Sequence, residues 1–174
     1  MLLDEFLRVC GDAGCEVEKF NIASLNLGPC RHCDYCLRAD TCRIDDDMRL
    51  LYPGLAKADC LVFAAPIYFM AHCAQAKMVI DRCQVFWARR YVRKLALRPP
   101  AAPTRRGVFI SVGATHGSKV FAGAKITMKW FFDALEMEYW GNLLFEGIDE
   151  PGAIRQHPTA LREARELGLK LTRS

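Results

Sequence analysis

At the start of the chain, the spacing of hydrophobic residues is first typical of a helix and then of a strand. Apolar side chains recur at helical spacing between residues 2 and 10, and Gly11 and Gly14 end this pattern, which predicts a first helix. In the following residues 15–22, Val17, Phe20 and Ile22 are the apolar positions, which favours a strand, with a break in the alternation near Phe20.

Three later segments have the pattern of strands. Residues 60–69 form a continuous apolar run that contains Pro66, and residues 107–113 form a second such run. Residues 138–145 are also strand-like. A continuous apolar run is typical of a strand that is buried on both faces of a parallel sheet.

Helical segments separate these strands. An aspartate within residues 45–47 can cap a helix that continues to about Lys57 and contains Pro53. Further helices are expected over residues 74–92 and 126–135, and from Pro158 to about Leu171. Strands that alternate with helices predict an α/β fold, in which a parallel doubly wound sheet lies between helices as a three-layer sandwich.

The composition predicts one domain. The chain has 174 residues, of which 52% are hydrophobic and 25% charged, so we expect a single domain over residues 1–174. No apolar run reaches the roughly 18 to 20 residues of a membrane span. The acidic start also lacks the basic residues of a signal peptide. We therefore expect a cytoplasmic protein without a membrane partner, whose nine cysteines are reduced thiols.

The positive charge is unevenly distributed. Between Arg82 and Phe132 the charged residues are all Lys or Arg, and the basic positions are dense over residues 89–106. This stretch could attract an acidic electron-transfer partner such as a ferredoxin, or it is balanced in space by the acids of residues 133–166. Because no aromatic-interleaved basic motif accompanies the charge, no nucleic acid partner is expected.

Four cysteines follow one another in a single short segment with the spacing Cys-x2-Cys-x2-Cys-x5-Cys, at Cys30, Cys33, Cys36 and Cys42. Thiolates at every third residue can bind the corners of an iron–sulfur cubane. Zinc sites usually join two separated pairs of ligands. Bacterial ferredoxin repeats have three residues before a Cys-Pro, which this chain lacks. The spacing favours a metal cluster in the loop of residues 29–44, and structural zinc is the alternative.

Ligands of a parallel doubly wound sheet bind beyond the carboxyl ends of its strands. Three loops are expected at this edge, over residues 23–45, 66–72 and 114–122, so the cysteine loop should lie beside the ligand crevice. The second loop is unusually apolar for a turn and suits a flat aromatic ligand, although packing within the loop is the alternative for Tyr68 and Phe69. The third offers small residues and unpaired amides. The candidate ligand contacts are Pro66, Ile67, Tyr68, Phe69, Met70, Ala114, Thr115, His116 and Gly117.

These segments resemble a known family. One segment of the chain is PIYFMAHCAQAKMVIDR. It is similar to the flavin-ring loop and following helix of the NAD(P)H-dependent FMN reductases, which have a flavodoxin-like fold. Together with the cysteine spacing, this segment resembles the iron–sulfur flavoproteins in particular. The resemblance implies FMN at the sheet edge, with residues 66–70 on one side of the isoalloxazine and residues 114–117 on the other. It also implies a 4Fe-4S cluster on the four cysteines, NAD(P)H as an electron donor, and homodimers or homotetramers.

The sequence departs from this family at its start. Family members begin with a strand and a loop that binds the FMN phosphate at the first helix, whereas this chain begins within that helix. The strand would be the central one of the sheet, between residues 15–22 and 60–65. We therefore expect the gene to encode roughly 20 to 30 further residues upstream, a strand plus a phosphate loop.

The sequence favours an electron-transfer flavoprotein or oxidoreductase that passes electrons between a 4Fe-4S cluster and FMN. Cofactors carry such chemistry, so no catalytic side chain is assigned. One alternative is an NAD(P)H-dependent FMN or quinone reductase with structural zinc in the cysteine loop. A second, from another class, is a non-enzymatic redox or metal sensor.

Overall fold

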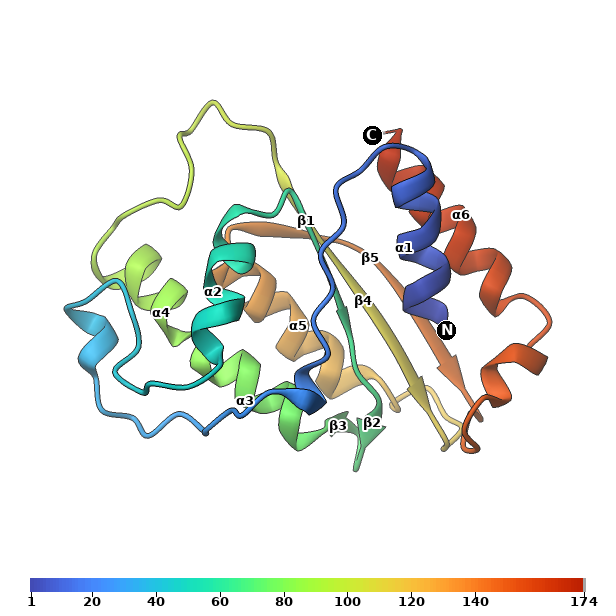
Figure 1. The fold of residues 1–174 in the computed structure, drawn as a ribbon. Helices are drawn as coiled ribbons and strands as arrows, with labels where there is room; N and C mark the ends of the chain where they lie inside the picture. The colour runs from blue at the N-terminus through green and yellow to red at the C-terminus, as the bar shows by residue number, and fades with distance from the viewer. Residues whose placement is uncertain (174) are drawn as a thin grey trace.

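A parallel sheet forms the centre of the molecule, and a computed structural model describes it over residues 1–173. Its strands β1 (Cys60–Ala64), β4 (Arg105–Gly113) and β5 (Met137–Glu146) lie in the order β1-β4-β5, with all neighbours parallel (Figure 1). Two short strands, β2 (Ile67–Tyr68) and β3 (Ala71–His72), pair with each other as an antiparallel hairpin beyond the carboxyl end of β1.

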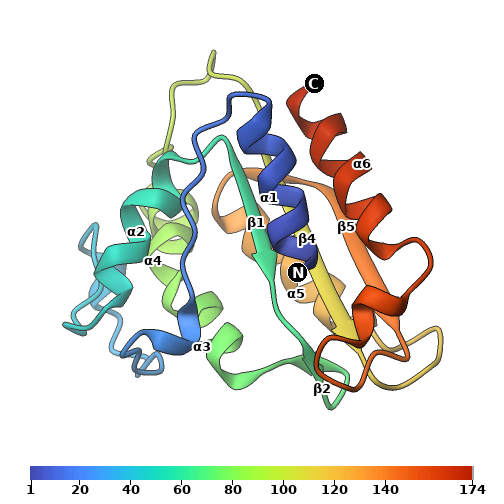
Figure 2. The same cartoon turned by 45° about the vertical axis from the view of Figure 1, so that its right-hand side comes forward.

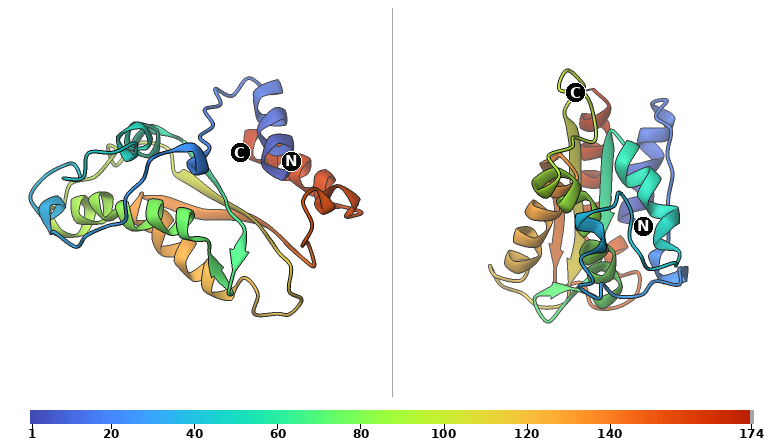
Figure 3. Two further views of the ribbon diagram at one scale, coloured as in Figure 1. Left: turned by 60° about the horizontal axis from the view of Figure 1, so that its bottom comes forward. Right: turned by 90° about the vertical axis from the view of Figure 1, so that its left-hand side faces the viewer.

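Helices cover both faces of the sheet and make the three layers of the expected α/β sandwich (Figures 2 and 3). One face is covered by α1 (Leu2–Asp12) and α6 (Ala160–Thr172). The other face is covered by α2 (Met48–Lys57), α3 (Ala74–Arg82) and α5 (Ala122–Ala134). The shorter elements are α4 (Gln84–Trp87), the π-helix η3 (Ala88–Val92), and the 3-10 helices η1 (Ile22–Ser24), η2 (Tyr35–Leu37) and η4 (Ala153–Gln156).

The sheet divides the core into two clusters because alternate residues of β4 face opposite layers. Val108 and Ile110 pack with α1 and α6, whereas Phe109 packs with the helices of the other face. The helices α1 and α6 approach so closely that a Cβ atom at Gly168 would lie 2.5 Å from a methyl group of Val9. None of the helices within residues 1–173 has the length and hydropathy that a bilayer crossing needs.

The expected strand over residues 15–22 does not form. Residues 15–20 have no regular secondary structure, and η1 begins at Ile22. A strand needs a partner for its backbone hydrogen bonds. Within residues 1–173 only β4 pairs with β1, so the other edge of β1 offers no intervening strand to which this segment could bond.

The other predicted elements form with shifted bounds. The strands expected within residues 60–69 and 107–113 are confirmed as β1 and β4, and the strand-like segment 138–145 is confirmed as β5. The expected burial holds for β4, whereas in β1 only Phe63 is buried. The helix expected over residues 74–92 is divided at Cys83 into α3 and α4, and continues as the π-helix η3. The helix capped within residues 45–47 is confirmed as α2, where the Asp46 carboxylate accepts a hydrogen bond from the Met48 amide at 3.1 Å.

Candidate functional site

The four predicted metal ligands line one cavity. Cys30 and Cys33 are exposed, and Cys36 and Cys42 are partly buried, on the loop that connects η1 to α2. The cavity has a volume of about 320 Å³, and residues of α3, α4 and η3 form its other wall. The topology therefore brings together all four thiols that the sequence spacing singles out.

The charges of these thiols are coupled. Burial raises the pKa of the Cys36 thiol, and negative charge on Cys42, Cys30 and Cys33 raises it further. Four thiolates around one cavity repel one another unless a cationic centre lies between them. Metal binding at such a site therefore releases protons.

The four cysteines are among the residues that line one cavity. Among residues 1–173, no three side chains of His, Cys, Asp or Glu are arranged to hold a single metal ion. A tetrahedral zinc ion needs its sulfur ligands at about 2.3 Å, whereas an iron–sulfur cubane is a larger body with one cysteine at each iron. The donor set and the cavity fit the chemistry of a cluster.

The arginines of the basic stretch are largely paired within the molecule. Arg89 and Arg93 both donate to the Asp40 carboxylate, at 2.6 and 2.5 Å, and this pairing ties the cysteine loop to the π-helix. Hydrogen bonds from Arg93 and Arg89 hold the pKa of Asp40 below its usual range. Arg90 pairs with Asp133. The acids of residues 133–166 therefore pair with only some of these arginines. Most of the acidic partners lie earlier in the chain.

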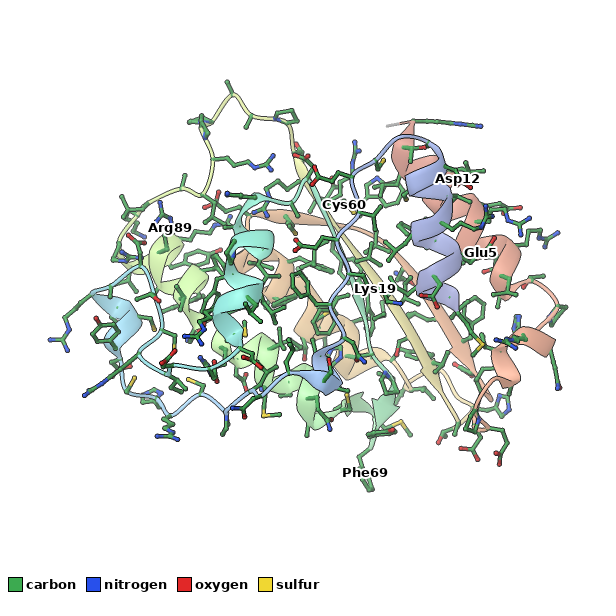
Figure 4. The ribbon with its side chains drawn as sticks, viewed as in Figure 1. Glu5, Asp12, Lys19, Cys60, Phe69 and Arg89 are labelled. Carbon is green, nitrogen blue, oxygen red and sulfur yellow. The ribbon has the colours of Figure 1, made fainter. Side chains whose placement is uncertain are left out.

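The predicted ligand loop at residues 66–70 forms the β2–β3 hairpin. Its tip is a two-residue turn in which Phe69 and Met70 have φ angles of 51° and 61°. This left-handed region is costly for bulky residues, and glycine or asparagine is the usual choice in such turns. Tyr68 is 60% exposed, and Phe69 is fully exposed at the tip (Figure 4). The alternative of loop packing is thus wrong for these two side chains.

The second predicted ligand loop lies at the same edge of the sheet, and Ala114, Thr115, His116 and Gly117 are all exposed. Gly113, just before this loop, is in close contact with β2, because a Cβ atom there would lie 3.7 Å from Ile67 Cβ. The His116 ring lies close to Gly147 at the end of β5, and the Gly117 amide donates to Glu146 at 2.9 Å. The fold thus brings both predicted flavin loops together.

The cysteine cavity and the hairpin lie at opposite ends of α3, and the expected position of the cysteine loop beside the ligand crevice stays a prediction. The β2–β3 hairpin leads into α3 (Figure 1). The helix begins at Ala74, whereas the cavity is lined by Arg82 at its last turn. Nine residues of helix span roughly 13 Å at 1.5 Å per residue. Arg82 of α3 donates hydrogen bonds to both ends of the cysteine loop.

Sequence reasoning missed two residues beneath the cysteine loop. Arg82 lines the cavity and pairs with Asp46, and both side chains are buried. A signal was present, because Arg82 falls at a helical spacing with Ala76 and Val79 on the buried face of α3. A charged residue on an apolar helix face needs a buried partner.

Known proteins resemble this chain in sequence and in fold. The "Iron-sulfur flavoprotein" of Archaeoglobus fulgidus is 41% identical over 90 residues, which cover 52% of this chain and 46% of that protein. An iron–sulfur flavoprotein of Methanocaldococcus jannaschii is 29% identical over 128 residues, 73% of this chain and 59% of that protein. The chain thus spans about half the length of the curated relatives it matches.

The fold matches that of a flavin enzyme at low sequence identity. The FMN-dependent NADH-azoreductase of Bacillus anthracis superposes with a TM-score of 0.64 at 14% identity, over 98% of this chain and 89% of that one. Together with the parallel sheet between two helical layers, this similarity makes the fold flavodoxin-like. The family model for NADPH-dependent FMN reductase matches residues 1–141, most of the chain. The chain therefore belongs to the NADPH-dependent FMN reductase family.

Proposed function

We propose that the protein is an electron-transfer flavoprotein, an oxidoreductase that passes electrons between FMN and a 4Fe-4S cluster. The observation that carries the proposal is the cavity lined by Cys30, Cys33, Cys36 and Cys42 in a chain of an FMN reductase family. These four thiolates would hold the cluster, with one sulfur for each iron. The names of the archaeal relatives support the same cofactor pair.

The flavin contacts that we propose are the two loops at the sheet edge. Tyr68, Phe69 and Met70 present exposed apolar surface for one side of the ring, with Pro66 and Ile67 at their base. Ala114, Thr115, His116 and Gly117 present exposed backbone for the polar edge of the ring. Bound FMN supplies the one- and two-electron chemistry, with NAD(P)H as the proposed donor. The protein's part is to bind the ring and to keep the thiolates in place.

Metal analysis after anaerobic purification tests the cluster. We expect about four irons and as many sulfides per chain, lost in Cys33→Ala and retained in Cys15→Ala. Cys15 is an equally exposed cysteine outside the cavity and serves as the control. Stoichiometric zinc without acid-labile sulfide would contradict the cluster and favour the zinc-containing reductase.

FMN titration tests the flavin loops. Phe69→Asn relieves the left-handed backbone at the hairpin tip, so it should raise thermal stability slightly while weakening FMN binding by about tenfold, the loss of one contact of about 1.4 kcal/mol. Leu50→Ala, which removes exposed apolar surface from α2, is the control and should leave binding unchanged. Unchanged FMN affinity in Phe69→Asn would remove the hairpin tip from the site.

An acidic electron-transfer protein such as a ferredoxin is the partner that we propose for the cysteine face. Arg31, Arg38 and Arg43 are exposed on the cysteine loop and have no ion pair within residues 1–173. Reversing Arg38 and Arg43 to Glu should slow association more at low salt than at high salt. Arg162→Glu on α6 is the control. Equal rates for all variants would exclude electrostatic docking at this loop.

A homodimer or homotetramer is the assembly that we propose. The support is exposed apolar surface on α5, where Ile126 is 63% and Trp130 62% exposed, near the exposed hairpin tip. Light scattering on a sizing column should give a multiple of 19.7 kDa, and Trp130→Glu should reduce it. A monomer at all concentrations would contradict this assembly.

A further inference from the structure

The two ends of the cysteine loop meet at one guanidinium group. Arg82 Nη1 donates to the Gly28 carbonyl at 2.9 Å, and Nη2 donates to the Ile44 carbonyl at 3.3 Å. The Asp46 carboxylate accepts from the same two nitrogens, at 2.5 and 3.0 Å, and from the Gly28 amide at 2.8 Å. One side chain of α3 therefore fixes both the entrance and the exit of the loop.

This ion pair is almost completely removed from solvent. The side chains of Arg82 and Asp46 are 1% and 6% exposed. Burial raises the pKa of Asp46, but the hydrogen bonds from Arg82 and from the Gly28 and Met48 amides outweigh it and leave the pKa lowered. Buried ion pairs add little net stability compared with apolar residues of the same shape, but bidentate pairs fix geometry.

The loop between these ends depends on few other contacts. Its regular structure is the single turn η2, and Asp40 forms a second attachment through Arg89 and Arg93. Arg82 Nε is buried without a hydrogen-bond partner in the described chain. Arg82 also lines the cysteine cavity, so the residue that holds both ends of the loop is part of the cavity wall.

We propose that Arg82 and Asp46 are positioning residues for the cysteine site. They join both ends of the loop to α3, so that the four thiols surround one cavity before any cluster is bound. The identity of the cluster rests on the proposed function, whereas the ordering of the loop does not. The thiols of a loop with free ends would instead sample many arrangements, and cluster assembly would have to order them.

The test compares neighbouring carboxylates in the full chain. Asp46→Asn removes the buried charge. Asp45→Asn removes an exposed charge one residue away, whose ion pair within residues 1–173 is with Arg49. Trypsin cleavage after Arg31, Arg38 and Arg43 reports the order of the loop in the metal-free protein. Iron and sulfide after anaerobic reconstitution report assembly. Asp46→Asn should be cleaved in the loop about tenfold faster than wild type and hold less than half of its iron, whereas Asp45→Asn should match wild type.

Each outcome separates this inference from the proposed function. Equal cleavage and equal iron in the two variants would overturn the positioning role. A wild-type protein with a protected loop but without iron and sulfide would overturn the proposed cluster, and the positioning role would stand.

A second variant covers the case in which Asp46→Asn unfolds. Arg82→Met combined with Asp46→Leu leaves no unpaired buried charge. It also removes the hydrogen-bond partners of the Gly28 and Ile44 carbonyls and of the Gly28 and Met48 amides, so it should fold with a melting temperature below that of wild type. We expect fast loop cleavage and poor iron binding in this double variant. Wild-type values for both measurements would overturn the proposal.

Discussion

Arg105 at the start of β4 is expected to carry a large share of the stability at the amino end of the sheet. The residue is 3% exposed, and its guanidinium donates to the carbonyls of Ala58, Leu135 and Leu55, at 2.8, 2.5 and 2.6 Å. These carbonyls belong to the last turns of α2 and α5, where helical carbonyls lack intrahelical partners and carry partial negative charge. One side chain therefore completes the ends of two helices.

The change to test is Arg105→Met, which keeps the length and leaves three buried acceptors without a donor. At the lower limit of about 1 kcal/mol per buried unsatisfied group, the loss is about 3 kcal/mol. For a protein of this size the melting temperature should fall by about 6 to 12 °C. In Arg105→Lys the ammonium is a point donor and can bond only some of the three carbonyls. The melting temperature of this variant should therefore lie between those of wild type and Arg105→Met.

Thermal unfolding followed by circular dichroism measures these differences. Lys125→Met, an exposed substitution on α5, is the control and should change stability by less than about 0.5 kcal/mol. A melting temperature for Arg105→Met within 2 °C of wild type, about the shift expected for less than 1 kcal/mol, would refute the reasoning. Arg105→Lys with wild-type stability would show that the forked geometry is not needed.

Three further changes test the packing and the electrostatics of the fold. Gly168→Ala should lower stability by about 1 to 3 kcal/mol, because the added Cβ would lie 2.5 Å from a methyl group of Val9 on α1. Gly11→Ala is the control, because its Cβ would enter open space, and it should raise helix stability. Equal melting temperatures of the two variants would contradict the close contact between the helices. Hydrogen bonds from Arg8 and Arg165 lower the pKa of Glu5 from 4.5 to about 2, so its stabilisation is complete above 4.5 and lost as the pH falls toward 2. The melting difference between wild type and Glu5→Gln should therefore vanish at low pH, and a constant difference would contradict this. Burial lowers the pKa of His72 below 6.5, so urea unfolding should show wild type losing stability as the pH falls below 6.5 and His72→Phe losing less.

The strands and layers of this fold could be predicted from the sequence because their signals are local. The runs that become β1 and β4 are apolar at nearly every position, as strands covered on both faces must be. Residues 15–22 show where this reasoning ends. Their alternation is also local, but a strand exists only where a neighbouring backbone accepts its hydrogen bonds, and sequence periodicity carries no information about that neighbour.

The candidate site could also be predicted only in part from the sequence. The spacing of Cys30, Cys33, Cys36 and Cys42 lies within one loop, so it predicted a set of residues that the fold then placed around one cavity. The partners of Arg82 and Arg89 lie 36 and 49 residues away in sequence. The basic stretch therefore looked like free positive charge, although most of its arginines are paired in space with acids from earlier segments.

The shared anchor of the cysteine loop has a consequence for how such a loop can evolve. Because both ends of the loop meet at Arg82, an insertion within the loop would lengthen a closed ring without moving α2, α3 or the sheet, provided that Asp40 keeps its pairing with Arg89 and Arg93. Closing a flexible ring costs only about 0.6 kcal/mol more for each doubling of its length. The length of the loop can therefore change at low cost in folding free energy while the helices and the sheet that hold it stay in place.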